Sequence, residues 1–477
     1  MTRNLGEEPK PSILETAKQL RAELSEDYHD KVMTAIYADA AQIADTTISR
    51  DTKKANLTFD RALDRILTHP IGGFVAMGLM FLIVFWITIA GANIPSQMLG
   101  DLLLGTVYNL LHQLATALSL PVWLSGFLID GIYLATAWVI AVMLPPMAIF
   151  FPLFTLLEDF GYLPRVAFNL DRLFASAGTH GKQSLSMMMG FGCNAAGVIS
   201  TRIIDSPRER LIAILTNNFS ICNGRWPTLI LMGTIFIGAL APPALASLVA
   251  ALSVVTIAVL GIVMTLIVSW GLSKTWLKGE TSVFSLELPP YRPPQILQTL
   301  YTSIIDRTLI VLWRAVMMAA PAGAVIWLSS NIMIGDASIA AHLVNLLNPI
   351  GWFLGMNGVI LVAYIVAIPA NEIVIPTILM LTMTLGKVAG AQAGVMIELD
   401  DAQVYHVLTE VGGWTLLTAI NLMLFSLLHN PCSTTILTIW NETKNLKWTM
   451  VATFLPIAMG VAVTFTTTLV AHLLGFV

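Results

Sequence analysis

The chain has 477 residues, of which 56% are hydrophobic and 11% charged, and its mean hydropathy is +0.77. Soluble proteins carry about a quarter charged residues, so this composition excludes a single water-soluble globule. The net charge of −4, without a Lys/Arg run, excludes nucleic-acid binding, and three cysteines cannot form a disulfide framework.

Residues 1–66 are predicted to form a cytosolic helical arm. They hold all 22 formal charges that precede Ile71, out of 54 in the chain, and Ile13, Leu14, Ala17 and Leu20 recur at helical spacing. No secretory signal precedes the first apolar stretch, so the N-terminus is expected in the cytoplasm, in agreement with the Lys/Arg residues before the first span.

The membrane spans follow from charge-free stretches, at about 20 residues per crossing. They predict an all-α polytopic membrane protein with roughly eight transmembrane helices and several broken or interfacial pieces. A Pro-rich connector, 274–308, separates one half at 67–273 from a second at 309–477. The stretches read as spans are 71–90, 131–157 with a kink at Pro145-Pro146, 226–273 as two crossings broken at Pro242-Pro243, 315–335, 337–371, 411–441 and 448–477; 102–129, broken at Pro121, reads as interfacial.

A phosphate loop is missing from this sequence. In the nearest candidate, Gly178–Gln183, the glycines are two residues too close and no hydroxyl follows the lysine. We therefore predict no nucleotide hydrolysis by these residues, no enzymatic activity and no covalently bound cofactor.

Polar motifs interrupt the apolar stretches at corresponding places in the two halves. Because polar groups are costly in hydrocarbon, such interruptions indicate function, and paired interruptions are typical of a transporter's site near the middle of the bilayer. The motifs are Glu158–Arg165, Gly190–Asn194, Asn217–Pro227, Ile368–Glu372 and His429–Thr434.

All three cysteines lie in these breaks, which favours a site for a soft or intermediate divalent cation such as Fe(II). The predicted metal-binding residues are Cys193, Cys222, Cys432, Asn194, Asn371 and Glu372. Residues predicted to serve ion access or gating are Glu158, Asp159, Ser220, Asn223 and His429. A Cys432–His429 nucleophile is disfavoured because no orienting Asp or Asn is assignable.

At these motifs the sequence resembles the membrane domain of the ferrous-iron transporter B family. The matching stretches are Asp64–Gly73 (DRILTHPIGG), Glu158–Arg172 (EDFGYLPRVAFNLDR), Gly190–Asn194 (GFGCN), Asn218–Pro227 (NFSICNGRWP), Pro369–Met380 (PANEIVIPTILM) and Leu427–Lys447 (LLHNPCSTTILTIWNETKNLK). The resemblance implies two inverted "gate" repeats, uptake of Fe(II) into the cytosol, and metal contacts at Cys193, Cys222 and Cys432.

The sequence also departs from the family pattern in two places. Family members usually carry an N-terminal GTP-binding domain, of which only a helical linker is recognisable here, and the family's Cys-Asn-Val-Pro is Cys193-Asn194-Ala195-Ala196. We therefore expect an inner-membrane permease of a bacterial or archaeal cell that is driven by the membrane potential or by a separately encoded small GTPase. A small accessory protein and a homo-oligomer are further expectations.

Two other interpretations stay open. One is a gate-repeat permease for a nucleoside or another small organic solute, which would need aromatic and amide groups but no thiols. The other is a membrane scaffold or sensor that transports nothing and binds a partner through the N-terminal arm.

Overall fold

The computed structural model describes residues 28–47, 56–69, 71–179, 181–279, 291, 295–386 and 401–475. The chain divides into two compact units, one of Met1–Ala62 with Ser282–Glu287 and one of Leu63–Thr281 with Leu288–Val477. The predicted helical periodicity at residues 13–20 and residues 280–290 and 292–294 of the Pro-rich connector lie outside the described residues. Both predicted membrane halves belong to the second unit.

The first half of the chain is helical wherever it is described. The α-helices are α2 (Tyr28–Thr47), α3 (Asn56–Leu67), α4 (Gly72–Gly100), α5 (Tyr108–Ala117), α6 (Val122–Ser125), α7 (Leu134–Phe160), α8 (Tyr162–Ser176), α9 (Lys182–Gly192), α10 (Asn194–Ser200), α11 (Pro207–Thr216), α12 (Trp226–Met232) and α13 (Pro243–Lys274). The π-helical segments are η1 (Asp101–Val107), η2 (Gly126–Tyr133) and η6 (Gly233–Ile237), and the 3₁₀ turns are η3 (Thr201–Ile203), η4 (Asn217–Phe219), η5 (Asn223–Arg225) and η7 (Gly238–Leu240).

The second half adds one short antiparallel strand pair to a helical frame. Its elements are α14 (Ile296–Thr302), η8 (Ser303–Leu309), α15 (Ile310–Asn331), β1 (Met333–Ile334), β2 (Ala337–Ser338), α16 (Ile339–Phe353), α17 (Gly358–Val366), η9 (Asn371–Ile373), α18 (Val374–Leu385), α19 (Asp401–His406), η10 (Val407–Val411), α20 (Leu416–Leu428), α21 (Ser433–Thr443) and α22 (Leu446–Leu473).

The protein is a helical, multi-pass membrane protein. Within the described ranges five helices are long and apolar enough to cross a bilayer, and a sixth crossing results if the pair α16 and α17, bent by 112°, counts as one span. Three shorter apolar helices lie at Gly72–Thr88, Ile296–Ile305 and Asn371–Met383. The five or six crossings found among the described residues are fewer than the roughly eight predicted, and several apolar stretches there are divided into helices too short to span about 30 Å by themselves.

Proline explains two of the breaks and is tolerated elsewhere. Pro121 separates α5 from α6, and Pro242-Pro243 separates η7 from α13, as predicted. Helix α7, in contrast, continues through Pro145, Pro146 and Pro152. Neighbouring helices and local adjustments re-satisfy freed backbone groups inside membranes, so a proline there does not have to end a helix.

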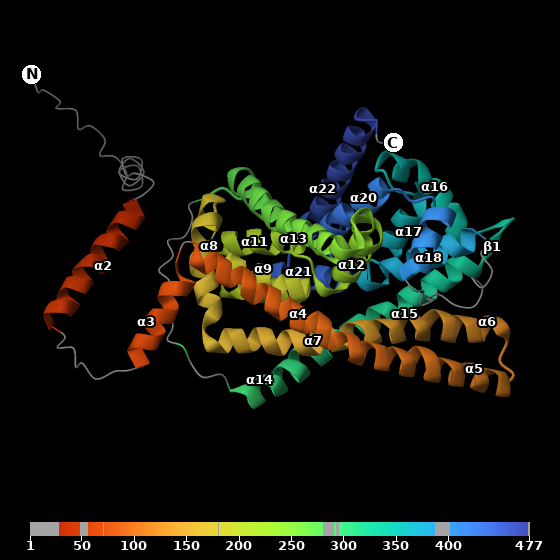
Figure 1. Ribbon diagram of the computed structural model, residues 1–477, viewed down its shortest axis with the longest axis horizontal. Helices are drawn as coiled ribbons and strands as arrows, with labels where there is room; N and C mark the ends of the chain where they lie inside the picture. The colour runs from red at the N-terminus through yellow and green to blue at the C-terminus, as the bar shows by residue number, and fades with distance from the viewer. Residues whose placement is uncertain are drawn as a thin grey trace, which may run out of the picture. The chain divides into compact units, whose positions relative to one another are not determined.

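Glycines allow close packing of α15 against the segment that precedes α7. A Cβ on Gly323 would collide with the Gly131 carbonyl, and a Cβ on Gly131 would lie 3.0 Å from Trp327. In membranes, where lipid is as apolar as the helices, such small-residue contacts supply much of the packing energy. Figure 1 shows α7 and α15 crossing in the membrane unit.

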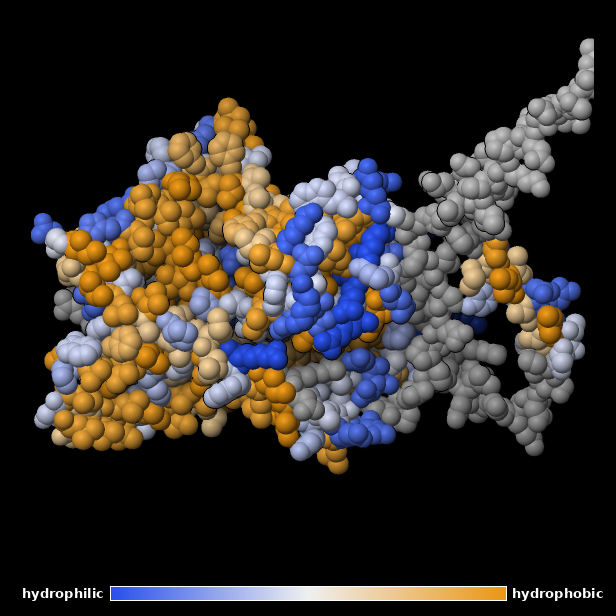
Figure 2. Space-filling view, turned by 180° about the vertical axis from the view of Figure 1, so that it is seen from behind, coloured by the Kyte–Doolittle hydropathy of each residue, from blue (hydrophilic) through white to orange (hydrophobic). Residues whose placement is uncertain are grey.

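Much of the surface of the membrane unit is apolar. Large hydrophobic side chains that are more than half exposed recur on α4, α13 and α22, among them Trp86, Leu252 and Phe454. Figure 2 shows broad hydrophobic areas beside a hydrophilic band on one face. A surface of this kind is typical of a protein whose solvent is lipid.

The Asp64 carboxylate ties α3 to α8 and to the connector. The Arg165 guanidinium donates to Asp64 at 3.0 Å, also donates to the Gly161 carbonyl, and lies 4.1 Å from the centre of the Tyr291 ring. Tyr291 donates its hydroxyl hydrogen to Asp64 at 2.7 Å. Partial burial acts to raise the pKa of Asp64, but these donors and the positive charge hold that pKa below its ordinary value.

Asp64→Asn is expected to destabilise the protein by about 1 to 2 kcal/mol at neutral pH, because it removes a charge-assisted pair. A lowered folded pKa means that ionised Asp64 contributes stability above its ordinary pKa, and this contribution is lost as pH falls through the folded pKa. Thermal unfolding in detergent from pH 7 to pH 3 should therefore show the difference between wild type and variant shrinking at acid pH. A difference that stays constant with pH would contradict this assignment.

Candidate functional site

Four helix breaks converge in the membrane unit. Cys193 is extended between α9 and α10, Cys222 between η4 and η5, and Ala370 immediately before η9. In the fourth break, residues 429–432 separate α20 from α21, and Cys432 precedes the first residue of α21. Every break ends one helix and starts another, so it exposes carbonyl and N–H groups that a continuous helix would pair.

One cavity of about 40 Å³ brings these breaks together. Its polar lining comes from three cysteines, three asparagines, a carboxylate and a hydroxyl, and α7 and α15 supply its apolar wall. Since a water occupies about 10–15 Å³ on this measure, the cavity has room for a few waters or for an ion with part of its hydration. The lining residues are Met143, Met147, Gly192, Cys193, Asn194, Cys222, Asn223, Gly224, Ala315, Pro369, Ala370, Asn371, Glu372, Cys432 and Thr434.

All six residues predicted to bind metal line this cavity, together with Asn223 from the access set. The other predicted access residues lie elsewhere. Glu158 and Asp159 are exposed at the end of α7, where Asp159 accepts a hydrogen bond from Thr299 at 2.6 Å. Ser220 and His429 are buried beside the breaks without lining the cavity.

The possible metal ligands are spread around the cavity and do not form one cluster. Among the described residues, no three His, Cys, Asp or Glu side chains lie close enough together to hold a metal ion. The cysteines are unpaired with one another, and Cys432 Sγ lies 3.2 Å from Thr435 Oγ1. Dispersed ligands suit a site that must release its ion, because transport requires binding that is weak or spread over several positions.

Arg225 joins the break in the first half to the break in the second. Its guanidinium is buried, with 1% of its surface exposed, and donates to the Asn218 carbonyl at 2.8 Å and to Asn218 Oδ1 at 2.8 Å. It also donates to the carbonyls of Leu427, His429 and Asn430 at 3.0 to 3.3 Å. These bonds satisfy the carbonyls that are freed where α20 ends.

His429 is held in a polar network and is not free to act as a nucleophile's base. Its Nδ1 lies 2.8 Å from the Ser426 carbonyl and its Nε2 lies 3.1 Å from Asn371 Oδ1. The Tyr364 ring packs against the imidazole, with 4.7 Å between centres. His429 therefore positions Asn371, a cavity-lining residue of the same half of the chain.

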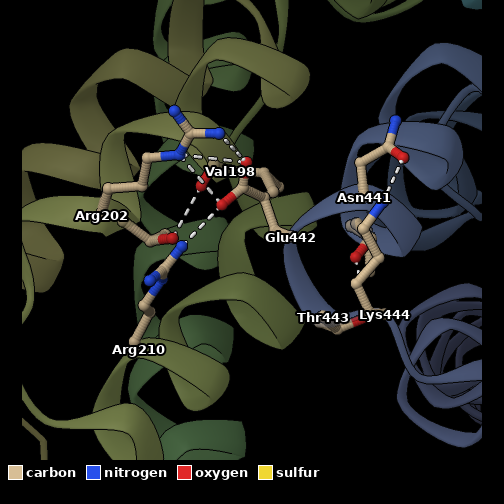
Figure 3. A network of polar contacts seen from close by, with 9 residues as sticks. Val198, Arg202, Arg210, Asn441, Glu442, Thr443 and Lys444 are labelled. Atoms are coloured by element: carbon tan, nitrogen blue, oxygen red, sulfur yellow. Dashed lines mark hydrogen bonds and ion pairs between the residues drawn. The ribbon is translucent and has the colours of Figure 1, made fainter.

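A second connection between the halves lies at the end of α21 (Figure 3). Glu442 accepts from Arg202 at 2.5 Å and from Arg210 at 2.6 Å, and its side chain is only 6% exposed. Arg202 follows α10 and Arg210 lies on α11, so two cations of the first half share one carboxylate of the second. Charge-assisted pairs of this kind fix relative orientation as well as adding energy.

Sequence reasoning missed Met143, Met147 and Arg225. The two methionines belong to a continuous apolar run, so no local signal separates them from packing residues. Arg225 did carry a signal: an arginine between a Cys-Asn-Gly break and an apolar run is costly unless it is paired.

Gly224→Ala is expected to disturb the cavity, because a Cβ at this position would collide with the carboxyl group of Glu372. The carboxylate would have to move away from Gly224 and so change its place in the cavity, and metal binding should weaken by about tenfold. Titration of the purified variant with Fe(II) under anaerobic conditions measures this. Gly78→Ala is the matched control, since no atom lies within 4 Å of its added Cβ; equal affinities for both variants would contradict the placement of Glu372.

Comparisons with known proteins identify the same segments. Residues 140–236 and 312–446 match a family described as "Gate: Nucleoside recognition", and residues 254–306 match "Ferrous iron transport protein B C terminus". The chain is 31% identical over 418 residues, 87% of its length, to "Fe(2+) transporter FeoB" of Staphylococcus aureus strain COL. It is 28% identical over 84% of its length to the Synechocystis protein of that name, and 34% identical over 56% to the Salmonella typhimurium one.

The chain spans about 60% of the length of the Staphylococcus and Synechocystis relatives and 33% of the Salmonella protein. No solved structure matches the chain. The two Gate segments contain all four of the breaks that form the cavity.

Proposed function

The chain belongs to the FeoB family through its membrane portion, and from this premise we propose that it carries ferrous iron, or a related divalent cation, across a membrane through the thiol-lined cavity. The observation that carries the proposal is the convergence of Cys193, Cys222 and Cys432 on one cavity from three distant parts of the sequence. Fe(II) would enter this site as substrate, not as a resident cofactor.

The donor set fits such a cargo. Thiol groups favour softer metal ions, whereas the Glu372 carboxylate and the asparagine amides accept harder ones, so the mixture suits a late divalent ion of the first transition row. Thiols bind metals as thiolates, and metal capture at Cys193, Cys222 and Cys432 would release protons. Sequential contact with dispersed ligands would let the ion pass from one side of the cavity to the other.

The membrane potential is sufficient as a driving force. It supplies ~2.3 kcal/mol per charge per 100 mV, hence about 4.6 kcal/mol for a dication. In this proposal the N-terminus is cytoplasmic, uptake is directed inward, and any GTP hydrolysis is contributed from outside these 477 residues. A small GTPase, a small accessory protein or a second copy of the chain would then act on the membrane unit.

A nucleoside is a poorer fit than a metal ion. Pockets for drug-sized organic ligands measure about 300–1,000 Å³, far above the 40 Å³ of this cavity. Free thiols would also serve no purpose in binding a sugar and a base. A scaffold without transport would not need three thiols, three amides and a carboxylate lining one internal space.

Purified protein in liposomes tests this function. With an inside-negative potential imposed by a K⁺ gradient and valinomycin, anaerobic Fe(II) influx should exceed that of empty liposomes, and Mg²⁺ influx should not. Uridine influx is measured in parallel, together with Fe(II) binding to the detergent-solubilised protein. Uridine influx without Fe(II) influx would support the nucleoside alternative, and absence of both Fe(II) binding and Fe(II) influx would refute metal transport.

A further inference from the structure

A second group of buried oxygen atoms lies beside the first break and is separate from the thiol cavity. Asn217 and Ser220 are 3% and 1% exposed, and neither lines the cavity. Within the part of the chain that the structure describes, Asn217 Oδ1 and Ser220 Oγ have no hydrogen-bond partner. Burying polar atoms without partners is costly, so these oxygens point to something that binds them.

The hydrogen bond of the Asn217 amide nitrogen determines how this amide is oriented. Its Nδ2 donates to the Asn194 carbonyl at 2.8 Å, which leaves Oδ1 as the atom without a partner. Asn217 Oδ1 lies 2.8 Å from the position that a Cβ on Gly190 would take. It lies closer still to the position that a Cβ on Gly197 would take. Ser220 Oγ lies 3.1 Å from the same position on Gly190. Both oxygens therefore lie directly against glycines, where an added Cβ would crowd them.

The Asn194 side chain contacts the same place. One terminal atom of its amide lies 3.3 Å from Asn218 Oδ1, and the other lies 3.0 Å from the Gly190 carbonyl and 3.2 Å from the Ser220 carbonyl. With its NH₂ group on the second side, Asn194 donates to both carbonyls. Each carbonyl oxygen has two lone pairs, so one remains for a further partner.

We propose that a monovalent cation of the Na⁺ class binds between α9 and η4, with Asn217 Oδ1, Ser220 Oγ and the carbonyl oxygens of Gly190 and Ser220 as its ligands. Helix α9 ends at Gly192, so the carbonyls of its last turn lack intrahelical partners and carry the negative end of the helix dipole. Unwound carbonyls and the C-terminal ends of half-helices are the groups with which transporters hold Na⁺.

The charge of the ligands sets the charge of the ion. All four oxygens are neutral, whereas divalent hard cations such as Ca²⁺ are usually held by several carboxylates. Arg225 is the charged side chain bonded to this break, and its hydrogen bonds go to Asn218 and to carbonyls of residues 427, 429 and 430. Its donors therefore leave the Asn217 and Ser220 oxygens available to a single positive charge.

The position of this site links it to the thiol cavity. Ser220 lies two residues before Cys222, and Gly190 lies three residues before Cys193. A cation that orders both breaks would hold two of the three thiols in place and would couple the monovalent ion to metal passage. This coupling rests on the proposed function, whereas cation binding does not.

The test measures binding of ²²Na⁺ to the purified full chain by equilibrium dialysis, at constant ionic strength with choline as the replacement ion. Wild type should bind Na⁺ saturably, and Gly190→Ala, which places a Cβ 2.8 to 3.1 Å from both oxygens, should bind Na⁺ about tenfold or more weakly. Ser220→Ala removes one ligand with little change in volume and should also weaken binding. The matched controls are Gly271→Ala, which has no atom within 4 Å of its Cβ, and Ser253→Ala, whose hydroxyl already bonds the Ala250 carbonyl.

Absence of saturable Na⁺ binding by folded wild type, or equal binding by wild type, Gly190→Ala and Ser220→Ala, would overturn the proposal and assign the oxygens to a buried water. Fe(II) influx is measured separately with Na⁺ or choline outside the liposomes, and Na⁺ should raise it. Fe(II) influx without Na⁺ binding would reject the cation site and leave the proposed function standing. Na⁺ binding without Fe(II) binding or influx would support the cation site and refute the proposed function.

Discussion

Cys432→Ser is expected to lower the initial rate of Fe(II) influx by about tenfold or more while leaving the protein folded. A hydroxyl replaces the thiol with little change in shape and can keep the contact with Thr435 Oγ1, which lies 3.2 Å away. The loss should therefore fall on the metal, because a neutral hydroxyl is a much poorer ligand than a thiolate for Fe(II). Cys222→Ser should have a similar effect, since Cys222 lines the same cavity.

Influx into liposomes under a fixed potential measures this effect, and gel filtration confirms that each variant is folded. Thr435→Val is the control, because it removes the hydroxyl beside the thiol but keeps the thiol itself. If both serine variants retain wild-type influx, the thiol pathway is wrong even where iron transport itself is observed. If Thr435→Val loses as much influx as Cys432→Ser, the effect cannot be assigned to the sulfur as a metal ligand.

Arg225→Met should have the largest effect on stability, a loss of about 3–5 kcal/mol. The side chain is 1% exposed and donates to Asn218 and to three carbonyls at the end of α20. Removing it leaves these acceptors buried without donors and separates the break at residues 217–225 from the break at 429–432. Arg225→Lys should be intermediate, because lysine keeps the charge but cannot supply the planar set of donors.

Thermal unfolding of detergent-purified protein, together with the yield of monodisperse protein, measures the effect. Arg202→Met is the matched control, since the Arg202 side chain is 63% exposed and Glu442 keeps Arg210 as its second partner. We expect little change in the unfolding temperature of this control. An Arg225→Met protein as stable as Arg202→Met would show that the carbonyls find other donors.

The sequence by itself determined the helical membrane class, the places where helices break, and the chemical types of the candidate ligands. These are local properties. The length of a charge-free stretch indicates a membrane span, and Asn, Gly, Pro or Cys within an apolar run indicates an interruption that is energetically costly. The breaks at Cys193, Cys222 and residues 429–432 could therefore be predicted one by one. Their pairing in two halves also followed from order along the chain.

Only the tertiary structure decided which of these residues share one cavity. Cys193 and Cys432 lie 239 positions apart (432 − 193), and nothing local to either cysteine indicates that both border the same 40 Å³. The role of Arg225 likewise depends on carbonyls of Leu427, His429 and Asn430, which belong to the other half. The bend of 112° between α16 and α17 likewise appears only in the folded protein, because an apolar run does not reveal whether it continues across the bilayer or turns back.

The physical reason is that hydropathy and helix-breaking propensity act over a few residues, whereas a cavity is formed by long-range packing. Two polar breaks stabilise each other only when packing brings the donors of one to the acceptors of the other, as between Asn218 Nδ2 and the His429 carbonyl at 2.7 Å. The oxygens of Asn217 and Ser220 illustrate the same point: their residue types are evident in the sequence, but their lack of donors appears only in the folded protein.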